Sequence, residues 1–282
     1  METLLAFESD TILDQANYQL FIQISSKSLT YTVFDKPGRK FAGLKHYMFE
    51  DTTESDFKHN IQSILTDDEI LLTEFTNVIV QFESIKVMLV PASLFDSKNL
   101  KSFLKYHHDV SEKDLISFTE LKNADAFVIF SYPMFIEEIF RKHFENIRFI
   151  HHSVPFINNV YLTKQNEIEP CFHIHFAHDF FDVLLVKNGN IQLYNSFSYK
   201  KYTDVIYFIS NIINIHSLSP EKIRIIISGE IARSSEMVSE LNKIFNDIQF
   251  EKYSPQYKYN EALFALPQSR FVNLLNISHC EL

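Results

Sequence analysis

The sequence predicts an α/β fold made of two duplicated halves, each with a mixed sheet flanked by helices. Three observations predict it. Each half opens on three consecutive antiparallel strands, and each closes on a buried strand, a helix and another strand. The closing segments also match in sequence, with Phe-Glu-Asn-Ile-Arg-Phe at residues 144–149 and Phe-Asn-Asp-Ile-Gln-Phe at residues 245–250. We therefore expect an N-terminal half of residues 1–153 and a C-terminal half of residues 154–282.

The opening strands of the second half have the clearest local pattern. Residues 172–176 read Phe-His-Ile-His-Phe, so alternate side chains lie on opposite faces of a strand. A tight turn from Ala177 to Asp179 leads into a strand at residues 180–186. Asn188 and Gly189 both tolerate the positive φ of a type I′ turn, which predicts a hairpin to a third strand at residues 191–197.

The first half opens in a similar way. Alternating apolar residues predict strands at 18–24, 29–34 and 41–49, and the turns between them contain Ser, Asp, Pro and Gly. Thr52 or Thr53 is placed to cap a helix that ends near Leu65. Residues 1–17 have one short apolar patch, and no strand is predicted there.

The closing segments are predicted as strand, helix and strand in both halves. In the first half they span residues 125–131, 134–144 and 145–153, and in the second half 222–228, 234–245 and 246–254. Ser131 and Ser228 are equivalent in this alignment, and the first half has an insertion around residues 84–121. Other short strands are expected at 77–82 and 86–90, and other helices at 93–107, 154–162, 202–216 and 257–266, the last ended by Pro267.

Composition excludes several classes of protein. The formal net charge of -10 argues against nucleic acid or an anionic membrane surface as a partner. The two cysteines, Cys171 and Cys280, are too few for a disulfide framework or a zinc knuckle. The sequence has no signal-peptide pattern and no apolar run long enough to span a bilayer, so we expect a cytoplasmic protein without membrane insertion.

The order of elements is the plan of the actin-like ATPase fold, which is related to the ribonuclease H-like fold. Three short runs, Leu-Tyr-Asn-Ser-Phe at 193–197, Asp-Val-Ile-Tyr at 204–207 and Ile-Ser-Gly-Glu-Ile at 227–231, resemble an uncharacterised bacterial domain-of-unknown-function family with this fold. The resemblance covers nearly the whole chain in its order of elements. It implies the fold and no activity, because none of these runs is catalytic.

Active members of the actin-like superfamily have two phosphate-binding hairpins, each with an aspartate followed by a glycine and a hydroxyl residue. The resemblance places these hairpins at residues 23–28 and 173–179, and both lack the acid and the glycine. Of the paired glycines of the adenosine motif, only Gly229 remains. We therefore predict degenerate nucleotide-binding loops without a catalytic residue, whose remaining nucleotide contacts would be Ser25, Ser26, Lys27, His175 and Gly229.

Two functions are compatible with this interpretation. The first is a non-catalytic interaction or scaffold module that binds another protein or a short peptide and needs no cofactor. It would resemble the actin-like proteins of bacterial pilus and secretion assemblies, which bind a short peptide of a partner. The alternative is an ATPase or phosphotransferase with atypical phosphate loops, which would bind ATP and magnesium.

The histidines of the second hairpin suggest a further hypothesis. His173 and His175 share one face of a strand, and His178 in the turn could complete a zinc-like set of three ligands. The competing interpretation, which we adopt as the expectation, is that His173 and His175 face a cleft or solvent beside a turn and hold no metal.

Overall fold

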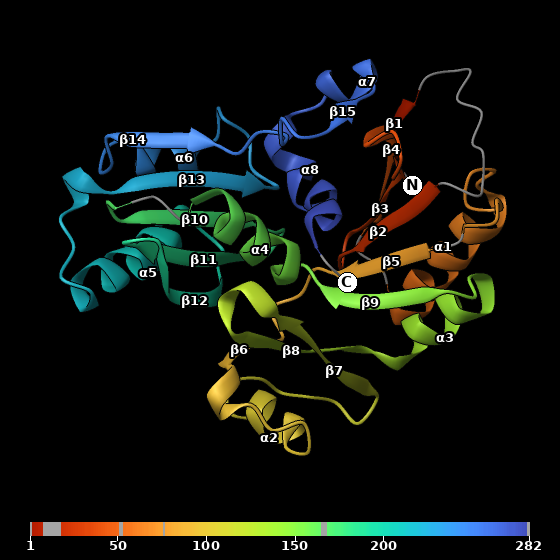
Figure 1. Ribbon diagram of the computed structural model, residues 1–282, viewed down its shortest axis with the longest axis horizontal. Coiled ribbons are helices and arrows are strands. Elements are labelled where there is room, and N and C mark those ends of the chain that lie inside the picture. The colour runs from red at the N-terminus through yellow and green to blue at the C-terminus, as the bar shows by residue number, and fades with distance from the viewer. Residues whose placement is uncertain (1, 8–17, 51–52, 76, 165–167, 281–282) are drawn as a thin grey trace. The chain divides into compact units, whose positions relative to one another are not determined.

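The computed structural model describes residues 2–7, 18–50, 53–75, 77–164 and 168–280 (Figure 1). These residues form two compact units. Unit 1 comprises Met1–Glu120, Phe127–Val154 and Ser254–Leu266, and unit 2 comprises Leu121–Ala126, Pro155–Tyr253 and Pro267–Leu282. The chain leaves unit 1 at Val154, beside the expected boundary between residues 153 and 154, but Ser254–Leu266 returns to it.

Unit 1 is built on a mixed sheet with the strand order β1-β4-β3-β2-β5-β9. The strands β2, β3 and β4 form the predicted antiparallel meander, and β5 and β9 then add to β2 in parallel. The short strand β15 pairs with β4 outside this order. The strands are β1 (Glu2–Phe7), β2 (Tyr18–Ile24), β3 (Ser28–Asp35), β4 (Lys40–Met48), β5 (Asn77–Phe82), β9 (Ile147–His151) and β15 (Lys258–Tyr259).

Two helices of unit 1 contact each other. The helix α1 (Glu54–Asp67) begins after Thr53, whose side chain accepts from the Asp56 amide, while the Asp56 carboxylate accepts from the Thr53 amide. This confirms Thr53 as the cap, and Thr52 lies outside the described residues. The helix α3 (Met134–His143) contacts α1, with the rings of Phe57 and Phe135 6.3 Å apart.

A three-stranded sheet in unit 1 occupies the predicted insertion and extends beyond it. Its order is β6-β8-β7, and a small core of Val90, Leu104 and Ile129 lies between the sheet and its helix. The helix predicted at 93–107 is shorter than expected, because it is reduced to a 3-10 turn and a six-residue α-helix. The elements are β6 (Val87–Pro91), η2 (Ala92–Leu94), α2 (Leu100–Lys105), β7 (Asp114–Leu121) and β8 (Ala126–Pro133).

The membership of β8 corrects the predicted duplication. The strand after the meander that lies parallel to its first strand is β5 in unit 1, whereas β8 pairs with β6 and β7. The equivalent strand in unit 2 is β13 (Arg224–Gly229), so Ser131 and Ser228 do not correspond. The prediction failed because a buried apolar run looks the same in either sheet. The matched endings do correspond, since β9 and β14 (Asp247–Phe250) are both the outer parallel strands.

Unit 2 contains a five-stranded sheet with the order β12-β11-β10-β13-β14. Its meander is confirmed, and Asn188 and Gly189 have φ values of 53° and 70° in the predicted hairpin turn. The helices α5 and α6 cover the face that carries Phe172, Ile174 and Phe176. The helices α4 and α8 lie on the other face (Figure 1). These elements are β10 (Cys171–Phe176), β11 (Phe180–Lys187), β12 (Asn190–Ser198), α4 (Ser153–Lys164), α5 (Tyr202–Ile215), α6 (Glu236–Leu241) and α8 (Gln268–Leu275).

Two segments near the ends of the described chain differ from the prediction. Pro267 does not end a long helix; it precedes α8, because proline is tolerated where a helix begins. The predicted helix at 257–266 is reduced to α7 (Glu261–Phe264), which follows β15, and the Asn260 side chain donates to the Ala42 carbonyl at 2.8 Å. At the other end, β1 pairs with β4 where no strand was predicted. Residues 8–17 of the predicted lead-in lie outside the described residues.

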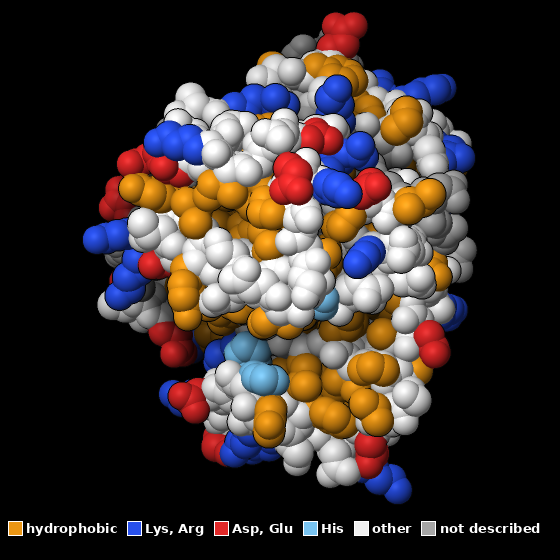
Figure 2. All heavy atoms as spheres, turned by 90° about the vertical axis from the view of Figure 1, so that its left-hand side faces the viewer, with side chains coloured by type: hydrophobic (Ala, Val, Ile, Leu, Met, Phe, Trp, Pro, Cys, Tyr) orange, Lys and Arg blue, Asp and Glu red, His pale blue; other side chains and the backbone are white. Residues whose placement is uncertain are grey.

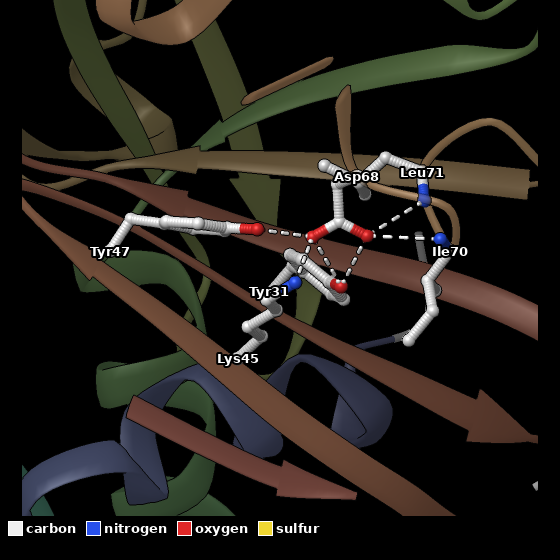
Figure 3. Close-up of polar contacts among 6 residues, drawn as sticks. All are labelled: Tyr31, Lys45, Tyr47, Asp68, Ile70 and Leu71. Carbon is white, nitrogen blue, oxygen red and sulfur yellow. Dashed lines mark hydrogen bonds and ion pairs between the residues drawn. The ribbon is translucent and has the colours of Figure 1, made fainter. Parts of the chain in front are cut away.

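A buried carboxylate ties the end of α1 to the meander of unit 1 (Figure 3). The Asp68 side chain is 1% exposed and forms an ion pair with Lys45 at 2.9 Å. Tyr31 donates to both carboxylate oxygens at 2.9 Å, Tyr47 donates to one of them, and the Ile70 amide donates at 2.9 Å. Burial favours a higher pKa for Asp68, but the hydrogen bonds from Tyr47, Lys45 and Tyr31 and the Lys45 charge together hold this pKa below its ordinary value.

We predict that Asp68→Ala lowers the free energy of unfolding by about 3 kcal/mol, because it leaves an ammonium group and two hydroxyls without their shared acceptor. Chemical denaturation measures this loss. Asp67→Ala is the matched control, since Asp67 is exposed, and we expect it to change stability by less than about 0.5 kcal/mol. Equal effects of the two substitutions would contradict the assignment.

The same carboxylate predicts a pH dependence. Because the folded-state pKa of Asp68 is depressed, its contribution to stability is complete at neutral pH and is lost as the pH falls below about 4, through the folded-state pKa. The difference in melting temperature between the protein and Asp68→Asn should therefore be largest at neutral pH and shrink in acid. A difference that does not depend on pH would exclude this role for the charge.

Candidate functional site

The strand order determines where the two predicted hairpins lie. In unit 1, β2 lies between β3 and the parallel strand β5, and in unit 2, β10 lies between β11 and the parallel strand β13. Each hairpin turn therefore lies beside the carboxyl end of a parallel strand, which is where open α/β sheets bind ligands. Ser25, Ser26 and Lys27 belong to the turn of unit 1, and His175 and Gly229 lie on neighbouring strands of unit 2.

The turn of unit 1 is closed by its own hydrogen bonds. The Ser25 amide donates to the Ser28 carbonyl at 3.0 Å, and the two serine hydroxyls lie 2.9 Å apart. The Ser25 hydroxyl also accepts from the Lys27 amide at 3.1 Å. In a phosphate-binding hairpin such amides donate to the phosphate. Here the amides of Ser25 and Lys27 already donate within the turn, and of the three candidate residues only Ser26 is exposed.

Two residues that the sequence did not single out lie beside this turn. Gln81 lies near the end of β5, directly opposite Gln23 on β2, and Glu83 is the first residue after the strand. The Gln81 amide donates to the Gln23 side chain, which donates in turn to the Glu83 carboxylate at 3.2 Å. Gln81 is fully buried, and its Oε1 atom has no hydrogen-bond partner among the residues that the structure describes. Polar residues at the end of an otherwise apolar strand were the signal that could have indicated this cluster.

The candidate position of unit 2, His175, is buried between neighbouring strands. It is 1% exposed, its Nδ1 atom lies 2.9 Å from the Ser228 hydroxyl, and its ring lies 5.8 Å from that of Phe156 on α4. The expectation that His173 and His175 face a cleft or solvent is wrong, because His173 is also 1% exposed. The physical reason is that α4 covers this face of the sheet at His175, and the sequence alone did not show which face α4 covers.

An acidic residue does lie beside His175, although it is not on the hairpin position expected for it. Asp182 is directly opposite His175 on β11 and is fully buried. Tyr194 donates to its carboxylate at 3.0 Å, and Ser196 donates to the same oxygen. The Asp182 carboxylate therefore accepts hydrogen bonds from side chains of β12. The polar residues that lie side by side across this sheet thus bond largely to one another.

The proposed metal ligands are not all on the same surface. His173 and His175 are buried on β10, whereas His178 is exposed in the turn. His173 lies near Cys171, with 3.5 Å between Nε2 and Sγ. Within the part of the chain that the structure describes, no group of three His, Cys, Asp or Glu side chains is arranged to hold a metal ion.

Gly229 is required by the backbone of unit 2 itself. It has a φ of +89°, and a Cβ atom built on it would lie 2.0 Å from the carbonyl oxygen of Phe176. The next amide, that of Glu230, donates to the same carbonyl at 2.7 Å. The close approach of β13 to the end of β10 thus explains this glycine without a nucleotide.

Comparison with known proteins identifies the fold. The sequence profile described as "Protein of unknown function (DUF3822)" matches residues 8–248. A protein of unknown function with an actin-like ATPase fold from Bacteroides thetaiotaomicron is 15% identical, with a TM-score of 0.81 over 96% of this chain and 100% of that one. The PilM-PilN type IV pilus biogenesis complex includes a chain that is 11% identical, with a TM-score of 0.57 over 92% of this chain and 97% of that one. The expected actin-like ATPase fold is therefore confirmed.

Two negative findings accompany these similarities. No curated protein matches the sequence. Of the helices in the described ranges, none has both the length and the apolar character needed to cross a bilayer.

We predict that Gly229→Ala lowers the free energy of unfolding by about 2 kcal/mol or more, since an alanine there combines a positive φ with a backbone clash. Denaturant titration without any nucleotide measures this effect. Gly38→Ala is the control, because its Cβ would meet only the side chain of Asp35, which can rotate away at the cost of one exposed hydrogen bond from the Gly38 amide. Similar stabilities of the two variants would show that the close approach of Gly229 to the Phe176 carbonyl does not require a glycine.

Proposed function

The chain belongs to the DUF3822 family of proteins of unknown function, and on that premise we propose that it is a non-catalytic actin-like protein that acts by binding another protein. The nucleotide-binding loops of the fold are degenerate in this proposal. The chain keeps the scaffold, and its loops bond to themselves where active members bond to phosphate.

The observation that carries this proposal is the closure of the unit 1 turn. The Lys27 amide, which would have to donate to a phosphate, donates to Ser25 Oγ instead. Opening the turn to a nucleotide would break this bond and the contact between Ser25 and Ser28. A ligand would have to replace these bonds to bind with useful affinity. The hairpin in unit 2 adds support, because the position of its acid is taken by the buried His175.

A protein partner is supported by analogy of fold alone. In the PilM-PilN complex, a chain of similar fold is part of an assembly for type IV pilus biogenesis. At 11% identity this likeness carries no information about which surface or which partner is used. It does indicate that binding another protein is within the range of this architecture.

The cluster of Gln23, Gln81 and Glu83 favours a second candidate, a nucleotide-binding ATPase or phosphotransferase. Glu83 supplies a carboxylate beside the unit 1 turn, and such a group could orient a water or a hydrated magnesium ion. The unpartnered Gln81 Oε1 is the specific observation behind it, because a buried acceptor of this kind needs a donor. A bound water would supply one as well as a ligand would.

Titration with ATP, ADP and GTP in the presence of magnesium distinguishes the two candidates. We expect no change in melting temperature with any of them. A true ligand at about 100 times its dissociation constant would add about 2.7 kcal/mol to the stability, which is a shift of several degrees. Equilibrium binding of a fluorescent ATP analogue is the independent measurement.

The variant Glu83→Gln serves as the matched control. A nucleotide-dependent shift that is present in the protein and absent in Glu83→Gln would refute the non-catalytic proposal and favour the ATPase candidate. A shift that survives in the variant would also refute it, and would place the nucleotide contacts away from Glu83.

A further inference from the structure

The outer strand of unit 2, β12, is an edge strand that is interrupted by a single β-bulge and carries no charged residue or proline. It is the first strand in the order of its sheet and has 9 residues, Asn-Ile-Gln-Leu-Tyr-Asn-Ser-Phe-Ser. None of them is charged and none is proline. The pairing with β11 shifts at Leu185 and Val186, which leaves Gln192 as an extra residue, but Leu193–Ser198 then runs on in regular register. An edge of this kind is a ready template for another strand.

The other edge strands of the described sheets differ from β12 in this respect. Each of them carries a charged residue or a proline, and these are the devices that block edge-to-edge pairing. The residues concerned are Glu2 on β1, Arg148 on β9, Pro91 on β6, Asp114 and Glu120 on β7, and Asp247 on β14.

An apolar surface continues outward from β12 over the helix beside it. Leu193 and Phe197 of β12 pack against the core of unit 2 but are only partly buried. The ring of Phe197 stacks on that of Phe208 of α5 at 4.3 Å, and the neighbouring Tyr207 is 62% exposed. Figure 2 shows hydrophobic side chains at the surface on the side of the molecule where α5 lies in Figure 1. A strand added to β12 would bury part of this surface.

Basic residues lie at both ends of β12. Lys187 precedes the strand, and Lys200 and Lys201 follow it. All three are at least partly exposed, and none of them forms an ion pair within the described residues. The carboxylate of Asp204 also lies near the second end, where it accepts from the backbone amides of Lys200 and Lys201 and offsets one of the two lysine charges. In a chain with a net charge of -10, this is a local basic frame around a neutral strand.

We propose that β12 binds an extended segment of a partner protein, which adds a sixth strand to the sheet of unit 2. The segment has apolar residues at alternate positions, which cover Leu193, Phe197 and Phe208, and acidic residues at both ends, which face the lysines. This proposal rests on the proposed function and names the surface and the partner chemistry for it.

A second copy of this chain fits the edge less well. An antiparallel pairing of two β12 strands would bring the beginning of β12 in one copy, where Lys187 of β11 lies beside Asn190, near the end of β12 in the other copy, which Lys200 and Lys201 follow. The basic groups of the two copies would then approach one another at both ends of the interface, and like charges repel. An acid-flanked partner turns the same positions into favourable pairs, and this difference is the reason for preferring it.

Two synthetic peptides test the proposal on the full chain. In the first, alternating Val and Thr residues are flanked by two Glu residues at each end, and in the second, Lys replaces every Glu. We expect the first peptide to bind, measured by fluorescence anisotropy, and to slow hydrogen exchange of the amides of residues 190–198. The second peptide should bind about tenfold more weakly.

Charge reversal provides the matched variants. The triple variant Lys187→Glu, Lys200→Glu and Lys201→Glu should reverse the preference and bind the Lys-flanked peptide more tightly. The control variant Lys98→Glu, Lys105→Glu and Lys142→Glu has the same net charge but should keep the preference of the original protein. Circular dichroism establishes that both variants are folded.

Four results would overturn the proposal. They are failure of the first peptide to bind, equal binding of both peptides, binding without protection of residues 190–198, and a dimer in sedimentation whose formation protects those amides, which would make a second copy the occupant. The outcome is separable from that of the nucleotide titration. If the peptide does not bind β12 and no nucleotide binds, only the proposed surface is refuted. If a nucleotide binds, the non-catalytic role is refuted whether or not the peptide binds β12.

Discussion

The parallel pairing between the first meander strand and the strand that follows a crossover organises each unit. In unit 1 this pair is β2 and β5, and in unit 2 it is β10 and β13. Parallel neighbours must be joined by a long connection, so the hairpin turn and the end of the crossover strand are brought together although they are far apart in sequence. All the candidate residues lie at these two junctions. In unit 2 the two parallel strands approach so closely at Gly229 and Phe176 that a side chain on residue 229 would clash with the Phe176 carbonyl.

Groups at these junctions are largely satisfied by one another. Ser25 and Lys27 bond within their turn, and His175 bonds to Ser228 on the neighbouring strand. Asp182 is held by Tyr194 and Ser196. A buried polar group needs a partner whether or not a ligand is present, so replacing an acid and a glycine by larger polar residues calls for a new set of internal bonds. Among the described residues of these junctions, Gln81 is where this internal set is incomplete, because its Oε1 atom accepts no hydrogen bond.

Local signals in the sequence were sufficient where a single short stretch determines the structure. The cap at Thr53 and the turn at Asn188 and Gly189 depend on one or two residues, and both are as predicted. The meanders and the outer strands of the matched endings, β9 and β14, also form as expected. The duplicated plan was therefore readable, because each of its units repeats the same alternation of apolar residues.

Features that depend on tertiary partners could not be read in the same way. Whether β8 joins the main sheet or a separate one is decided by its neighbours, and its apolar sequence fits both. The burial of His175 depends on which face of the sheet α4 covers, and the sequence of α4 alone does not determine that face. The local pattern predicts that Pro267 ends a helix, although the same residue is equally compatible with the beginning of α8. The Gln23, Gln81 and Glu83 cluster joins two strands separated by a helix, so no local window contains it.

The strand β15 determines when unit 1 can complete its folding during translation. It completes unit 1 by pairing with β4, and Asn260 and Ala42, which bond there, are separated by 218 positions along the chain. The rings of Phe34 and Phe41, against which Tyr257 packs, are synthesised long before that tyrosine leaves the ribosome. Unit 1 therefore cannot complete its folding until the whole meander of unit 2 has been translated. Until then, the rings of Phe34 and Phe41 lack their contact with Tyr257.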